Sequence, residues 1–261
     1  LEGVPGLAKT TAVQALSNAM SLDFRRIQFT PDLLPSDLLG TQIYNPKDGS
    51  FSTHKGPIFT NVVLADEINR APAKVQSALL EAMAERQVTL DGTSHPLPES
   101  FMVLATQNPL EQEGTYPLPE AQADRFLMKV RIDYPTASDE LAILRMKSSS
   151  APAVQPVASG DDLAAARRVV RAIRMEAVVE EYIVKLVQST RPGQGIGGGI
   201  AGKLIEVGAS PRATLALGIA ARAHAFLVRG RGYATPDDAK SVARDVLRHR
   251  VLLNYEAEAD G

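Results

Sequence analysis

The first half of the chain alternates short apolar runs with segments in which apolar residues recur at helical spacing. Residues 10–20 and 73–85 show the helical spacing. The short runs predict four strands, two of them almost continuously apolar: Phe24–Phe29, Asn61–Ala65, Phe101–Thr106 and Leu127–Ile132. Because strands alternate with helices, this half predicts an α/β fold with a parallel sheet covered by helices.

After about residue 138 the strand pattern stops, and the remaining chain predicts helices. Several of these segments begin with Ser, Thr or Asp, which suit an N-cap. The predicted helices are Asp139–Lys147, Asp161–Ile173, Glu180–Thr190, Pro211–Val228 and Pro236–Val246. We therefore predict an α/β core in residues 1–135 and an all-helical domain in residues 136–261.

Two further segments of the first half predict β-hairpins. Residues 40–57 contain Gly49, and residues 87–98 contain the pair Asp91-Gly92, which favours a tight turn. A hairpin inserted into an α/β core is costly to retain unless it makes contacts, so both segments are candidate contact elements.

Composition and charge exclude several classes of function. The 261 residues include no Cys, so disulfides, thiolate nucleophiles and Cys-ligated metals are ruled out. The formal net charge is −2, which argues against a general polyanion binder. The four His residues show no metal-ligand spacing. Because no apolar run reaches the roughly 18 residues of a membrane span and no signal peptide is visible, we expect a cytoplasmic protein.

A segment at the start of the chain nearly matches the phosphate-binding pattern G-x-x-x-x-G-K-[ST]. It reads Gly3-Val4-Pro5-Gly6-Leu7-Ala8-Lys9-Thr10, with Thr11 following. Backbone N–H groups of such a loop converge on phosphates, and the next helix directs its positive end at them. We expect Lys9 to reach the β- and γ-phosphates of a nucleotide and the Thr10 hydroxyl to hold Mg²⁺. Ala8 replaces the last glycine, which is tolerable if its backbone stays right-handed. The alternative is a Gly/Pro turn before an ordinary helix.

Two adjacent acids, Asp66 and Glu67, follow a later apolar strand. Phosphate loops and the carboxyl ends of parallel strands lie at the same edge of a sheet. Asp66 is therefore a candidate Mg²⁺ ligand, directly or through water, and Glu67 a candidate base for the attacking water. Acids are common at strand ends, but the combination of this acidic pair with an earlier phosphate loop is a specific indication of a nucleotide site.

Three more residues suit an ATP site, each with a simpler alternative. Asn108 is a candidate sensor of the lytic water or γ-phosphate, or the start of an Asn-Pro turn. Arg125 is a candidate arginine finger for a neighbouring subunit, or the partner of Asp124 or another nearby acid. Arg212 follows the candidate N-cap Ser210, where a cation opposes the helix dipole. A phosphate-sensing role is therefore favoured over a solvated surface arginine.

A second glycine-rich segment has the dinucleotide pattern G-x-G-x-x-G. It occupies residues 193–198 and follows a predicted helix instead of a strand. Because the βαβ context is missing, we interpret this segment as a loop of the helical domain.

Five segments, taken in order, resemble the MoxR family of AAA+ ATPases: GVPGLAKT, VVLADEINRAP, ATQNP, LPEAQADRF and GASPRA. The resemblance covers essentially the whole chain. It implies an AAA+ P-loop NTPase sheet with strand order 5-1-4-3-2 and a C-terminal helical lid domain. It also implies a hexameric ring with ATP and Mg²⁺ at each subunit interface, and it identifies both hairpins as insertions of one branch of these ATPases.

The resemblance further implies residue roles and partners. Family members are chaperone-like machines that work with proteins carrying a von Willebrand factor A domain, maturing enzyme complexes or inserting metal cofactors. Arg125 acts in trans, whereas cis or trans action of the second sensor stays open. The implied roles are phosphate and Mg²⁺ binding by Lys9 and Thr10, metal and hydrolysis chemistry at Asp66 and Glu67, and sensor or finger roles for Asn108, Arg125 and Arg212.

We therefore expect an ATP-driven ring that remodels partner proteins. The alternatives are a nucleic-acid motor and a nucleotide-gated scaffold with little turnover; a small-molecule kinase is disfavoured because Arg125 and Arg212 suit an oligomeric hydrolase. The acidic first half and the 5% aromatic content argue against nucleic acid as the substrate.

Only Leu1 and Glu2 precede the phosphate loop. We therefore also expect the first strand and the upstream helices to be missing, which would leave backbone hydrogen-bonding groups of the sheet unpaired.

Overall fold

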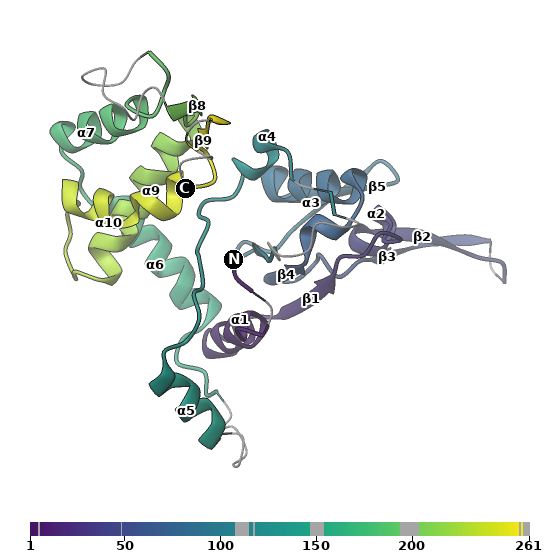
Figure 1. The fold of residues 1–261 in the computed structure, drawn as a ribbon. Coiled ribbons are helices and arrows are strands. Elements are labelled where there is room, and N and C mark those ends of the chain that lie inside the picture. The colour runs from purple at the N-terminus through teal and green to yellow at the C-terminus, as the bar shows by residue number, and fades with distance from the viewer. Residues whose placement is uncertain are drawn as a thin grey trace. The chain divides into compact units, whose positions relative to one another are not determined.

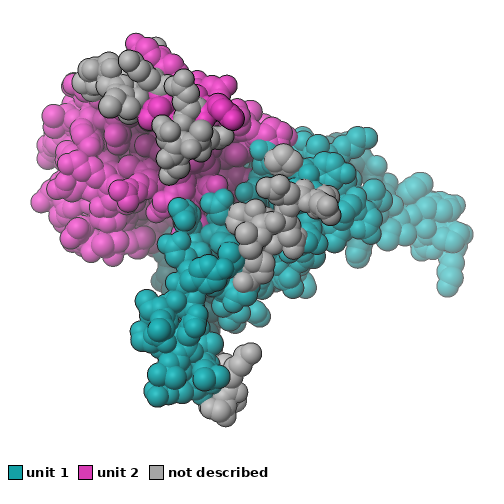
Figure 2. Space-filling model, in the orientation of Figure 1, with its two compact units in different colours: residues 1–118, 131–164 teal, residues 119–130, 165–261 magenta. Residues whose placement is uncertain are grey.

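The computed structural model forms two compact units, shown in ribbon form in Figure 1 and coloured separately in Figure 2. The described residues are 1–4, 6–47, 49–107, 115–116, 118–146, 154–193, 204–255 and 257. The first unit comprises residues 1–118 and 131–164, and the second comprises residues 119–130 and 165–261. The sequence predicts one division between residues 135 and 136, whereas the chain enters or leaves the second unit at three points.

A parallel sheet forms the centre of the first unit. Its strands are β1 (Phe24–Gln28), β4 (Val62–Asp66) and β7 (Met102–Ala105), in the order β1-β4-β7. Leu1 and Glu2 extend the sheet beyond β7, because the Leu1 amino group donates to the Ala105 carbonyl at 2.6 Å and Glu2 bridges in parallel to Gln107 and Arg131. Leu1 and Glu2 thus occupy the position of the first strand. Because Glu2 bridges to both Gln107 and Arg131, the arrangement of these two bridges and the three strands agrees with the order 5-1-4-3-2.

Strand β4 is buried on both faces, as the sequence predicts for a central parallel strand. Residues 62–65 are at most 1% exposed. Helix α1 (Lys9–Ala19) packs on one face through a cluster that joins Val13 to Val62 and Leu64. Helix α3 (Ala73–Glu85) has the predicted bounds, and its apolar side is buried.

Both predicted hairpins are confirmed. They consist of β2 (Gly40–Asn45) with β3 (Ser50–Lys55), and β5 (Gln87–Leu90) with β6 (Thr93–Pro96). At the tip of the second hairpin, Asp91 and Gly92 have φ values of 47° and 77°, the left-handed pair that a tight hairpin turn requires. The β2–β3 hairpin extends away from the sheet (Figure 1). The first unit also contains α2 (Pro35–Leu39), the 3₁₀ helix η1 (Ile68–Arg70) and α5 (Ala137–Met146).

The second unit is mainly helical. Its elements include α4 (Glu120–Ala123), α7 (Ala177–Gln188), α9 (Pro211–Leu227) and α10 (Pro236–Leu247), and α6 (Gly160–Ala172) runs into it from the first unit. Its core is built around small residues on α9, including Ala213, Ala216 and Ala220, against Ile183 of α7 and Val246 of α10. Among the described residues, no helix is long and apolar enough to cross a membrane.

Two features of the second unit differ from the sequence predictions. A short antiparallel pair, β8 (Ile205–Val207) with β9 (Leu252–Leu253), accompanies the helices. The predicted strand Leu127–Ile132 is wrong for residues 127–130, because only Arg131 bridges to the sheet. The backbone of this segment is bonded elsewhere: the Lys129 amide donates to the Asp245 carbonyl at 2.8 Å.

Candidate ATP site and the arginine cluster of the helical unit

The phosphate loop begins at the carboxyl edge of the parallel sheet. Glu2 immediately precedes it, and the Ile132 amide donates to the Glu2 carbonyl at 2.8 Å. Helix α1 begins at Lys9, so Thr10 and Thr11 lie in its first turn. The loop and the positive end of α1 therefore arise at one edge of the sheet, an arrangement that suits phosphate binding.

Backbone geometry explains the small residues of the loop. A Cβ on Gly3 would lie 2.6 Å from the Ile132 carbonyl oxygen, so this position has no room for a side chain. Gly6 has φ 87° and Ala8 has φ 53°, both left-handed. A right-handed backbone, the condition under which the sequence makes Ala8 tolerable at this position, is therefore not met. The turn into α1 imposes a conformation that costs an L-residue roughly 1–2 kcal/mol.

The Lys9 ammonium is held by the loop itself. Its Nζ donates to the carbonyl oxygen of Gly3 and, at 3.4 Å, to that of Val4. Neutral carbonyl acceptors orient this group without neutralising its charge, so the charge remains suited to attract phosphate. Pro5, also predicted to contact nucleotide, lies outside the described residues.

Asp66 and Glu67 lie at the same edge but have different partners. The Asp66 carboxylate accepts hydrogen bonds from the Arg26 Nε at 2.9 Å and from an Arg26 terminal nitrogen at 2.7 Å. The Glu67 carboxylate accepts from Gln28 Nε2 at 2.7 Å and pairs with Arg70 Nε at 3.1 Å. Sequence reasoning did not find these partners. The sequence could have suggested these partners, because Arg26 and Gln28 are two residues apart on a strand and therefore share one face of the sheet.

Thr106 connects the two acids and was not singled out from the sequence. Its Oγ1 accepts from the Glu67 amide at 2.9 Å and donates to the Asp66 carboxylate, while the residue is 1% exposed. Glu67 has a left-handed φ of 56°, a conformation that costs free energy for a residue with a side chain. The Thr106 hydroxyl therefore stabilises this turn. The only feature of the sequence that could have marked Thr106 as part of the site is its position directly after β7.

Removal of this hydroxyl is expected to weaken both the turn and the reaction. Thr106→Val leaves the Glu67 amide without its acceptor, so the free energy of unfolding should fall by about 1–3 kcal/mol and the ATP turnover rate should fall with it. Denaturant unfolding and steady-state ATPase assays measure the two effects. Thr106→Ser keeps the hydroxyl and should stay close to the parent protein; equal losses in the Ser and Val variants would contradict the role assigned to the hydroxyl.

Two sequence-predicted features cannot be placed from the described residues. Asn108, the candidate sensor, lies outside them, as do residues 194–198 of the second glycine-rich segment. The preceding Gln107 is described and bridges to Glu2, which immediately precedes the phosphate loop.

The oxygen donors at this edge fit a magnesium ion. Thr10 provides a hydroxyl directly after the phosphate loop, and Asp66 a carboxylate whose side chain is 14% exposed. Hydroxyl, carboxylate, water and phosphate oxygens are the ligands that Mg²⁺ prefers. No group of three or more His, Cys, Asp or Glu side chains forms a metal site among the described residues. The candidate site is thus of the kind in which phosphate and water complete the coordination.

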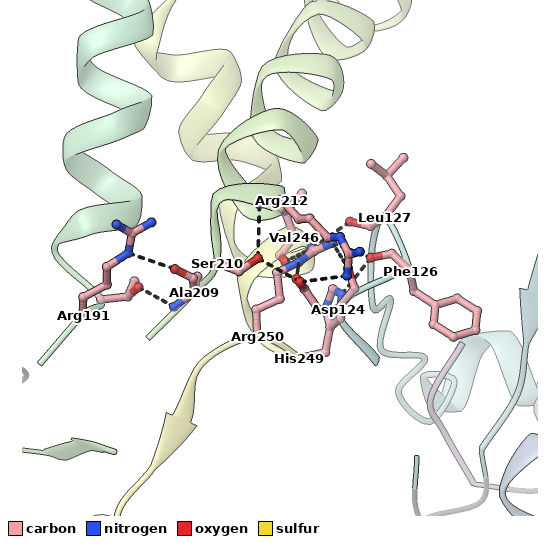
Figure 3. Close-up of polar contacts among 11 residues, drawn as sticks. Asp124, Phe126, Leu127, Arg191, Ala209, Ser210, Arg212, Val246, His249 and Arg250 are labelled. Carbon is pink, nitrogen blue, oxygen red and sulfur yellow. Dashed lines mark hydrogen bonds and ion pairs between the residues drawn. The ribbon is translucent and has the colours of Figure 1, made fainter. Parts of the chain in front are cut away.

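In the second unit, Asp124 lies at the centre of a partly buried polar cluster (Figure 3). Its Oδ1 accepts from Arg250 Nε at 2.7 Å and its Oδ2 accepts from Ser210 Oγ at 2.8 Å. The nearest terminal nitrogen of Arg212 lies 3.6 Å from Oδ2. Burial raises the pKa of Asp124, but these hydrogen bonds and the charges of Arg250 and Arg212 outweigh it and hold the pKa below its ordinary value.

Ser210 and its neighbours form the predicted start of α9. Ser210 is the N-cap, and its Oγ accepts from the Arg212 amide at 3.1 Å. Gly208 is required by close packing, because a Cβ there would lie 2.5 Å from the Thr190 carbonyl oxygen. Arg212 has Asp124 as a local partner, so its position in the first turn does not require phosphate to offset the helix dipole.

His249 belongs to the same cluster and is held neutral. Its Nε2 contacts the Phe126 carbonyl at 3.0 Å, which assigns the proton to that nitrogen. Burial is the main cause that lowers the pKa of His249 from 6.5 to about 4, and the charges of Arg250 and Lys129 lower it further.

The depressed pKa of His249 predicts an acid-sensitive stability. The unfolded chain takes up a proton below about pH 6.5 and the folded chain only near pH 4, so the contribution is complete above pH 6.5 and is lost as the pH falls toward 4. The free energy of unfolding should fall by about 2 kcal/mol from pH 7 to pH 5 through this residue. Denaturant unfolding at both values measures it, with His249→Gln as comparison. If the free energy of unfolding changes with pH by the same amount in both proteins, His249 is not the source of the acid sensitivity.

The strand order, the loop after the first strand and the acids after the third define an AAA+ P-loop ATPase. Family profiles agree: residues 1–128 match the profile described as "ATPase family associated with various cellular activities (AAA)" and residues 199–261 match the AAA lid domain. Chaperone MoxR1 of Mycobacterium tuberculosis is 47% identical over 260 residues, which cover 100% of this chain and 69% of that protein. Protein MoxR of Methylorubrum extorquens is 32% identical over 272 residues, which cover 97% and 78%.

A solved structure extends the comparison to three dimensions. The crystal structure of a candidate ATPase from Cytophaga hutchinsonii superposes with a TM-score of 0.91 at 52% identity, covering 100% of this chain and 79% of that one. This chain belongs to the MoxR family of AAA+ ATPases.

Proposed function

We propose that this chain hydrolyses ATP, with Mg²⁺, to drive chaperone-like remodelling or maturation of partner protein complexes. The observation that carries the proposal is the shared sheet edge: the phosphate loop follows Glu2, Asp66 ends β4 with Glu67 directly after it, and Thr106 joins the two acids. One relative of similar sequence is named a chaperone, and that name supports the remodelling part of the proposal.

The residues at this edge divide the reaction between them. The loop N–H groups and Lys9 bind the phosphates, and Thr10 and Asp66 hold Mg²⁺, which neutralises phosphate charge when bound. Glu67 orients the attacking water and accepts its proton. Because Gln28 and Arg70 bind the Glu67 carboxylate, they fix where this base lies.

The second unit supplies the arginines. Arg125 stabilises negative charge on the γ-phosphate of a neighbouring subunit, and Arg212 acts as the second sensor. Both side chains are exposed, as a group that contacts a ligand or another subunit must be. This division of labour needs a homo-oligomer, which we propose to be a cytoplasmic hexameric ring, with a von Willebrand factor A domain protein as a partner by family resemblance.

An ATPase assay across protein concentration tests the proposal. Turnover per subunit should rise as rings assemble, because each site needs Arg125 from a neighbour. The assay is repeated with DNA and with RNA at two salt concentrations. Strong, salt-sensitive stimulation by nucleic acid would favour a nucleic-acid motor, and no turnover in assembled rings would favour a nucleotide-gated scaffold.

A further inference from the structure

Arg250 is the most deeply buried cation of the described residues of the second unit, and its contacts point to one short segment. Its side chain is only 3% exposed. Its guanidinium donates to the Asp124 carboxylate at 2.7 Å and to the carbonyls of Asp124 at 3.0 Å, Phe126 at 2.5 Å and Leu127 at 3.1 Å, and also to that of Val246. Four of these five contacts fall on residues 124–127, which flank and include Arg125.

The acceptor side of this arrangement is equally specific. The Asp124 side chain is 15% exposed and receives hydrogen bonds from Arg250 and Ser210, whereas its neighbour Arg125 is exposed. Successive side chains thus take opposite roles, one anchored inward and one presented outward. The Lys129 amide bonds to the Asp245 carbonyl at 2.8 Å and extends the anchoring.

The same acid also contacts the second arginine of the proposed site. Arg212 lies 3.6 Å from the Asp124 carboxylate, and Ser210, which caps the helix of Arg212, donates to that carboxylate. Figure 3 shows Asp124 between Arg250, Ser210 and Arg212. One carboxylate therefore connects the Arg125 segment to the start of α9.

We propose that Arg250 and Asp124 form a positioning clamp that makes Arg125 and Arg212 parts of one rigid group. A change that moves α9 then moves both arginines together. Neither Arg250 nor Asp124 touches nucleotide in this proposal; they act through Arg125. The inference rests on the proposed function for its catalytic consequence, whereas the clamp itself is a property of the second unit.

The first test measures the clamp without any activity. Hydrogen–deuterium exchange of the full chain compares the parent protein with Arg250→Lys and Asp124→Asn. Amides of residues 124–131 should exchange about tenfold faster or more in both variants, while β4 stays unchanged. Arg248→Met is the matched control, because Arg248 pairs with Asp245 on the same stretch of chain at 3.1 Å. Unchanged exchange at residues 124–131 would overturn the clamp.

The second test measures its consequence for catalysis. Arg250→Lys should lower kcat by about 10-fold or more with KM nearly unchanged, since small misplacement of a catalytic group is costly. In an Arg125→Ala background the same substitution should have no further effect. Additive losses would overturn the coupling to Arg125. Asp124→Asn, which keeps the size of the side chain and removes the charge that Arg250 contacts, replaces Arg250→Lys if the latter does not fold, and the same criteria apply. Absence of turnover in the parent protein would defeat the proposed function, while the exchange data still decide the clamp.

Discussion

Replacing Glu67 with glutamine is expected to lower the ATP turnover rate by about 10²–10⁴-fold, the usual contribution of a general base. Glutamine has nearly the same shape, and its remaining carbonyl oxygen still accepts from Gln28 or Arg70, so the fold of the edge should persist. ATP affinity should change little because the phosphate loop is untouched. Single-turnover hydrolysis and equilibrium nucleotide binding separate the two effects.

The control for this substitution is Glu81→Gln, which makes the same chemical change on the exposed side of α3. It should leave both turnover and affinity unaltered. Retention of most of the turnover in Glu67→Gln would mean that another group activates the water. Loss of ATP affinity as well would place Glu67 in nucleotide binding. A variant that binds without hydrolysis would also hold partner proteins for identification.

Replacing Arg125 with alanine is expected to lower turnover by about 10³–10⁵-fold, equivalent to roughly 4–7 kcal/mol of transition-state stabilisation. The reason is that an exposed arginine on a segment anchored by Asp124 can reach a neighbouring subunit without rearrangement of its backbone. The contacts of Arg250 with the carbonyls of residues 124, 126 and 127 involve no side-chain atom of Arg125 and should persist in the variant. Steady-state ATPase and thermal unfolding give the two readouts.

Mixing the two inactive variants distinguishes action in trans from action in cis. In rings that contain both Arg125→Ala and Glu67→Gln subunits, some interfaces combine an intact Glu67 with an intact Arg125. Turnover should therefore recover partly. Arg131→Ala, at an exposed arginine paired with Asp133 at 3.6 Å, is the matched control and should remain active. Mixed rings that are demonstrably formed but stay inactive would contradict action in trans.

The regular elements were predictable because they rest on local patterns. The bounds of α3 follow from its helical spacing, and the turn at Asp91-Gly92 from the preference of these residues for positive φ. Burial of β4 on both faces follows from its continuous apolar sequence. The phosphate loop and the adjacent acids were likewise identifiable, because each is a short contiguous motif.

The failures concern contacts between distant residues and a conformation imposed by neighbours. Arg250 and Asp124 are 126 positions apart, and no local pattern marks them as partners. The same pairing explains why residues 127–130 are not a strand despite their apolar pattern, since backbone groups of Phe126, Leu127 and Lys129 are bonded to the helical unit. Ala8 takes a left-handed conformation because the loop closes onto α1, which residue preference alone does not predict.

The interleaving of the two units along the chain has a practical consequence for protein production. A lid fragment that begins at the sequence-based limit, residue 136, would lack Asp124, Phe126 and Leu127. Its Arg250 guanidinium would keep the Val246 carbonyl but lose its other four bonds, and a buried cation without its counter-charge is strongly destabilising. Any separately expressed lid should therefore carry residues 119–130 through a short engineered linker, so that the fragment follows the contacts of the fold instead of a single cut in the sequence.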